Sequence, residues 1–99
     1  TMKEITALQF EQIDKVHVLD VRRLIEFEQG SISGAINIAH TRLFDRLSEL
    51  DKGKEWVVNC HAGSRSAAAC MALKQEGFSV TNLAGGYKGW KEHTNCSLA

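Results

Sequence analysis

The apolar positions of the chain form short aliphatic or β-branched runs, and stretches of helical spacing separate these runs. Such runs predict strands that are covered on both faces of a sheet. The clearest are residues 16–21 (VHVLDV) and 56–59 (WVVN). Residues 35–38 and 80–83 predict two further strands, and residues 3–5 a possible edge strand.

Helical patterns lie between these runs. Thr6 followed by Gln9 is typical of a capping box, so the first helix is expected to begin near Ala7. Its expected apolar stripe consists of Leu8, Phe10 and Ile13, and that of a second helix of Leu43, Phe44, Leu47 and Leu50. A third helix is expected over residues 66–74, ending at Gly77. Residues 67–73 are all small or apolar, which predicts that this helix is buried against the sheet.

The alternation of strands and helices predicts an α/β fold with three layers. Its sheet should be mainly parallel, with four or five strands and helices on both faces, and its sites should lie at the carboxyl ends of strands. A chain of 99 residues with 43% hydrophobic content predicts one domain over residues 1–99. Because the sequence opens Thr1, Met2, excision from a longer multidomain protein stays open.

Charge and cysteine content narrow the function. Twelve Lys and Arg balance twelve Asp and Glu without a basic run, so neither nucleic acid nor a membrane surface is an expected partner. Three cysteines without a C-x-x-C pair, and no signal peptide or transmembrane run, predict free thiols and a cytoplasmic location.

The stretch NCHAGSRS, residues 59–66, carries the candidate chemistry. Cys60 ends a predicted strand, Gly63 permits a tight turn, and Arg65 precedes the third helix. A helix amino terminus stabilises anions and thiolates through its free N–H groups and its dipole. A lone cysteine is often only a small buried hydrophobe. Here the strand end, the glycine turn and the arginine all favour a nucleophilic thiolate instead.

Three segments resemble the rhodanese-like sulfurtransferases. CHAGSRS is similar to their active-site loop, in which four residues separate a cysteine from an arginine or a similar group. VLDVRRLIEFEQGSISGAINI, residues 18–38, resembles their Asp-x-Arg and Gly-His-Ile-Pro-Gly-Ala-x-Asn segments, although Ser31 replaces the usual histidine and Ser33 the usual proline. NLAGGYKGW, residues 82–90, resembles their closing Gly-Gly-x-x-x-Trp.

The resemblance implies sulfur transfer through Cys60. Its thiolate would take the sulfane sulfur of thiosulfate or a low-molecular-weight persulfide, carry it as a persulfide, and pass it to cyanide or a thiol. The resemblance calls for no metal and no organic cofactor. It implies a binding loop formed by His61, Ala62, Gly63, Ser64, Arg65 and Ser66, with backbone amides around the terminal sulfur.

Other residues are expected to support this loop. The side chain of Arg65 would either neutralise the incoming anion or brace the loop. Asp20 and Arg22 are expected to form an ion pair or loop cap, Gly86 with Gly85 a tight turn, and Trp90 a packing contact. Neither Cys70 nor Cys96 suits a resolving thiol, and His93 with Cys96 lacks the second ligand pair of a zinc site.

Two other functions remain open. One is a phosphatase of related fold, but its loop places five residues between cysteine and arginine, whereas this loop has four. The other is a sulfur-relay or interaction module that serves a fused or docked sulfur-metabolism domain.

Overall fold

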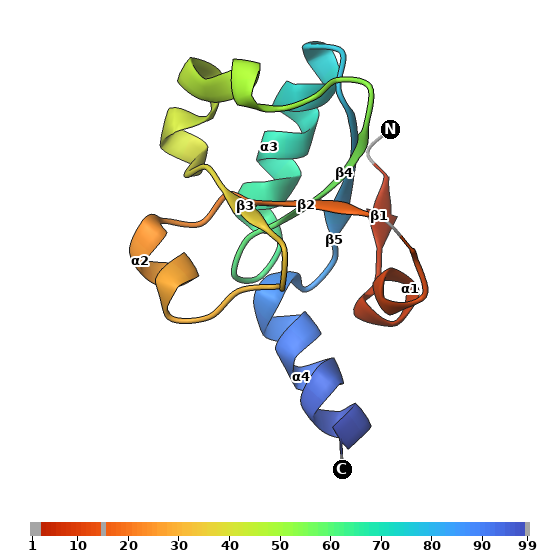
Figure 1. Ribbon diagram of the computed structural model, residues 1–99. Coiled ribbons are helices and arrows are strands. Elements are labelled where there is room, and N and C mark those ends of the chain that lie inside the picture. The colour runs from red at the N-terminus through yellow and green to blue at the C-terminus, as the bar shows by residue number, and fades with distance from the viewer. Residues whose placement is uncertain (1–2, 15, 99) are drawn as a thin grey trace.

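The computed structural model describes residues 3–14 and 16–98, with side chains as far as Asn95. Five parallel strands form one sheet in the order β1-β5-β4-β2-β3 (Figure 1). Their bounds are β1 Glu4–Ile5, β2 His17–Asp20, β3 Ile36–Asn37, β4 Glu55–Asn59 and β5 Ser79–Leu83. The five predicted strands and the parallel sheet are thus confirmed.

Helices cover both faces of this sheet, which confirms the three-layer prediction. They are α1 Ala7–Glu11, α2 Leu24–Glu28, the 3-10 helix η1 His40–Glu49, α3 Ser64–Gln75 and α4 Gly86–Leu98. On one face, η1 and α3 pack over a core that includes Leu43, Leu73 and Val58. On the other face, α1 and α4 pack over a core around Phe10 and Val57. No helix in the described part of the chain has the length and apolar character to cross a membrane.

For the first helix, the predicted start is correct, but the predicted stripe of buried apolar residues is wrong. Thr6 caps α1 reciprocally with Gln9, at 3.1 Å and 2.8 Å. Phe10 is buried, but Leu8 is 53% exposed and Ile13 is 44% exposed. A helix of five residues turns little more than once, so only one of these side chains reaches the sheet.

The second and third predicted helices also differ in detail. The segment around Leu43 is a 3-10 helix with a break at Arg46, and it leaves Phe44 59% exposed. The helix α3 begins at Ser64, two residues before the expected start, and Met71 on its outer side is 62% exposed. The sheet covers only the inner face of α3. Apolar residues on its outer face are therefore exposed, although the sequence predicted a buried helix.

Two helices were not predicted from the sequence. The helix α2 is one short turn whose Leu24 is 60% exposed, so it carries no buried stripe. The helix α4 begins at the glycine pair and packs Tyr87 and Trp90 against the sheet, with their rings stacked at 5.7 Å. The expected packing role of Trp90 is therefore confirmed. These two helices frame the carboxyl end of the sheet, where Cys60 lies.

Candidate active site

Cys60 lies directly after β4, in the middle of the sheet, and is 1% exposed. The chain then turns through Gly63, whose φ of +108° is one that side chains other than glycine rarely adopt. Gly63 is also the N-cap of α3. The twelve-residue helix therefore begins beside the thiol, and the free N–H groups of its first turn face the same region.

The sulfur of Cys60 accepts hydrogen bonds from backbone N–H groups and from a side-chain hydroxyl. The backbone N–H of Gly63 lies 3.0 Å from Sγ, and Ser66 Oγ lies 3.4 Å from it. Burial opposes ionisation of the thiol. The Ser66 hydroxyl and the backbone N–H groups of Ser66, Gly63 and Ala62 outweigh that effect and lower the pKa of Cys60 below its usual value. A thiolate is thus favoured at this position.

The predicted loop residues do not all act alike. Ala62, Gly63 and Ser66 stabilise the Cys60 sulfur directly. Ser64, Arg65 and Ser66 already form the first turn of α3. His61 is exposed. The loop proper is therefore shorter than the sequence predicts, because the helix begins earlier.

The guanidinium of Arg65 is held by a residue that sequence reasoning missed. It makes two hydrogen bonds to the Glu26 carboxylate on α2, at 2.8 Å and 3.0 Å. Chiefly through this bond, the pKa of Glu26 falls to about 2. Of the two roles expected for Arg65, the structure favours bracing the loop. No local pattern could have identified Glu26, because it lies 39 residues away and α2 itself was not predicted.

Asp20 and Arg22 form the expected ion pair beneath the loop. Both are buried, and the guanidinium donates to the carboxylate at 2.7–3.0 Å. It also donates to the carbonyl of Gly30 at 2.7 Å and lies 4.4 Å from the ring centre of Tyr87. The pair thus ties the end of β2 to α4 and to the segment after α2.

Gly86 connects α4 to the loop by direct backbone contact. Its φ is +60°, and a Cβ added there would lie 2.6 Å from the carbonyl oxygens of both Cys60 and His61. Those carbonyls accept the N–H groups of Tyr87 at 2.7 Å and Lys88 at 3.0 Å. The first turn of α4 therefore clamps the loop from outside, which agrees with the supporting role expected for Gly86.

A cavity of about 480 Å³ adjoins the loop between α2 and α4. His61, Tyr87 and the basic residues Lys88 and Lys91 are among its lining residues. Its walls carry charges of both signs, because Glu26 and Glu92 line it as well.

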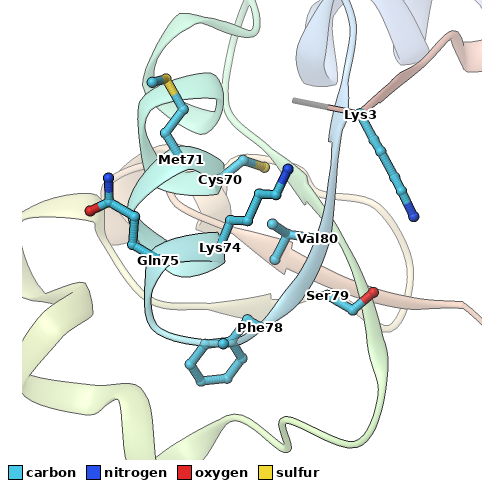
Figure 2. Close-up of a pocket in the computed structure, with 9 residues that line it drawn as sticks. Lys3, Cys70, Met71, Lys74, Gln75, Phe78, Ser79 and Val80 are labelled. Atoms are coloured by element: carbon cyan, nitrogen blue, oxygen red, sulfur yellow. The ribbon is translucent and has the colours of Figure 1, made fainter. Parts of the chain in front are cut away.

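Cys70 lines a different cavity. Figure 2 shows it on α3 together with Phe78 and Val80, which line a cavity of about 750 Å³ beside β5. Burial, with the nearby charges of Glu4 and Cys60, raises the pKa of Cys70 to about 12. Cys70 is therefore a neutral packing residue, as the sequence predicts, and the side chain of Cys96 lies outside the described residues. Within the described residues no group of three His, Cys, Asp or Glu side chains could hold a metal ion.

A parallel sheet with a cysteine loop at its carboxyl end is the arrangement expected of the rhodanese-like fold. Comparison with known proteins gives the same family. The chain belongs to the Rhodanese-like domain family, which it matches over residues 3–93. It is 35% identical to the putative sulfurtransferase YtwF of Bacillus subtilis, over 87% of this chain and 84% of that one. It is 31% identical to the thiosulfate sulfurtransferase GlpE of Shewanella oneidensis, over 86% and 85%. The crystal structure of a rhodanese-related protein from Thermoplasma volcanium superposes with a TM-score of 0.87 at 37% identity, covering 92% of each chain.

Proposed function

We propose that this protein is a rhodanese-type sulfurtransferase that works through a persulfide on Cys60. The observation that carries the proposal is the buried Cys60 sulfur with the N–H of Gly63 and the hydroxyl of Ser66 directed at it. These donors favour the thiolate, which is the nucleophilic form. The sulfurtransferase relatives support the same reaction class.

The reaction has two displacement steps. The Cys60 thiolate attacks the outer sulfur of thiosulfate, a new S–S bond forms, and the old one breaks to release sulfite with its electron pair. With a low-molecular-weight persulfide as donor, a thiolate leaves instead. Cyanide or an acceptor thiol then attacks the outer sulfur and restores the Cys60 thiolate. Displacement at sulfur is faster when the leaving anion is weakly basic, which favours sulfite.

The loop suits the outer sulfur of this intermediate. Backbone N–H groups of His61, Ala62, Gly63, Ser64 and Arg65 surround its position in our proposal. The donor enters through the adjoining cavity, where Lys88 and Lys91 would face its negative charge. In this scheme the protein contributes the Cys60 thiolate and the hydrogen-bond donors of the loop. We place the activity in the cytoplasm, where thiols stay reduced.

Intact-protein mass spectrometry tests the proposal. Incubation with thiosulfate should add one sulfur atom to the protein, and cyanide should remove it. Cys60→Ser should show no addition, whereas Cys70→Ser, which alters a buried neutral thiol, should load like the parent. Absence of an adduct together with hydrolysis of an aryl phosphate would move the protein into the phosphatase class. Absence of both would favour a relay module that takes sulfur from a protein partner.

A further inference from the structure

A buried polar chain leads from the Cys60 sulfur to the edge of the sheet. It runs from Sγ to the hydroxyl of Ser66, then to the side-chain amide of Asn82 on β5, and ends at the carboxylate of Glu4 on β1. Ser66 is 0% exposed and Asn82 is 1% exposed. A buried polar group costs free energy unless it is hydrogen-bonded. The hydrogen-bond partners of Ser66 and Asn82 therefore determine how these groups are oriented.

The amide of Asn82 can face Ser66 in one orientation only. Its Nδ2 lies 2.9 Å from Glu4 Oε2 and 3.3 Å from the carbonyl oxygen of Gly63, and both are acceptors. The flipped amide would place Oδ1 against these two oxygens with no proton between them. The Oδ1 atom therefore faces Ser66, and it can only accept a hydrogen bond.

The hydroxyl of Ser66 has one proton and several acceptors around it. Cys60 Sγ lies at 3.4 Å, the Gly63 carbonyl at 3.2 Å and Asn82 Oδ1 at 2.5 Å. The Gly63 carbonyl already accepts the N–H of Ala67 at 3.1 Å and the amide of Asn82, which fills its two lone pairs. The proton of Ser66 is therefore shared between Sγ and Asn82.

We propose that Asn82 is a positioning residue that accepts the Ser66 proton whenever the Cys60 sulfur is uncharged and yields it when the thiolate forms. In the thiol, and in a persulfide whose charge lies on the outer sulfur, Sγ is a weak acceptor and the hydroxyl turns to Oδ1. In the thiolate, Sγ is charged and the hydroxyl turns to it. The buried hydroxyl thus keeps a partner in every state of the cycle.

This assignment predicts opposite effects for two substitutions. Ser66→Ala removes a donor from the thiolate, so the midpoint of the pH profile for Cys60 alkylation should rise, with about tenfold less thiolate at neutral pH. Asn82→Ala removes the acceptor that competes with Sγ, so the midpoint should fall, with a few-fold more thiolate. In Ser66→Ala,Asn82→Ala the effect of the second change should vanish, because Asn82 acts through Ser66.

The measurement is alkylation by iodoacetamide as a function of pH, with the Cys60 peptide quantified by mass spectrometry. Other titratable groups near this end of the sheet are Arg65 with Glu26, Asp20 with Arg22, and His61. They and the neutral Cys70 are present in every variant, so the comparison cancels their contributions. A midpoint that stays the same or rises in Asn82→Ala, or an equal shift with and without Ser66, would overturn the assignment.

A variant at the exposed end covers the case in which Asn82→Ala does not fold. Glu4→Gln keeps an acceptor for Nδ2 but removes the charge that strengthens Oδ1, so a smaller fall is expected. The fall should shrink in the Ser66→Ala background, whereas plain loss of a charge would persist there and contradict the assignment. Glu55→Gln, another exposed strand glutamate that accepts from a side chain, is the control and should cause no shift.

The persulfide part of this inference rests on the proposed function, whereas the titration uses no sulfur donor. If Cys60 fails to load sulfur but the midpoints move as expected, the hydrogen-bond assignment holds and the proposed function fails. If Cys60 loads sulfur and the midpoints do not move, the reverse is true.

Discussion

The contact between Gly86 and the cysteine loop gives the sharpest test of how the fold holds the site. We expect Gly86→Ala to harm both stability and sulfur transfer. Its φ of +60° costs a residue with a side chain about 1–2 kcal/mol. The new methyl group would also lie 2.6 Å from the carbonyl oxygens of Cys60 and His61. Such overpacking costs about 1–3 kcal/mol, so the total is about 2–5 kcal/mol.

Gly34 supplies a matched control. Its φ is +82°, but a Cβ there meets no atom within 4 Å, so Gly34→Ala carries the backbone cost alone. Urea unfolding should therefore place Gly86→Ala about 1–3 kcal/mol below Gly34→Ala in free energy of unfolding. The same loop carbonyls must move in Gly86→Ala, so loading of Cys60 from thiosulfate should slow at least tenfold, while Gly34→Ala loads normally.

Two results would refute this reasoning. Equal stability of the two variants would mean that the loop carbonyls move away from the new methyl group without a cost in free energy of unfolding. A destabilised Gly86→Ala protein that loads sulfur at the parent rate would mean that the clamp supports the fold but not the geometry of Cys60.

Three further predictions concern charge. Cys60 should react with iodoacetamide at a pH below that of an ordinary cysteine, while Cys70, with its pKa of about 12, stays unmodified in the folded protein; equal reactivity would contradict the assignment of the site. The lowered pKa of Glu26 means that its ion pair contributes stability fully above pH 4.5 and loses it as the pH falls towards 2. Glu26→Gln should therefore flatten the acid limb of a stability-against-pH curve and cost about 1 kcal/mol at neutral pH, because the pair with Arg65 is partly exposed; an unchanged limb would count against the brace. Asp20→Asn leaves a buried guanidinium without its counter-charge and should cost about 3–5 kcal/mol in urea unfolding, and a loss below 1 kcal/mol would contradict the structural role of the pair.

Local patterns were sufficient where a feature depends on neighbours in the chain. The capping box of Thr6 and the strand before Cys60 depend on residues a few positions apart. The same holds for the glycine turn at Gly63, and all three were predicted. The burial of side chains was less predictable, because Met71 and Phe44 have the right character but face solvent. Whether an apolar residue is buried depends on which element packs above it.

The sequence by itself determined the class of fold, the position of Cys60 and the loop that surrounds it. These follow from short-range chemistry: a buried strand, a glycine with positive φ and the first turn of a helix. Only the tertiary structure decided what the loop residues contact. In it, Arg65 donates to Glu26, Ser66 donates to Asn82, and Gly86 lies against the Cys60 carbonyl. Those partners lie far apart in the chain and meet because parallel strands bring their carboxyl ends to one edge of the sheet.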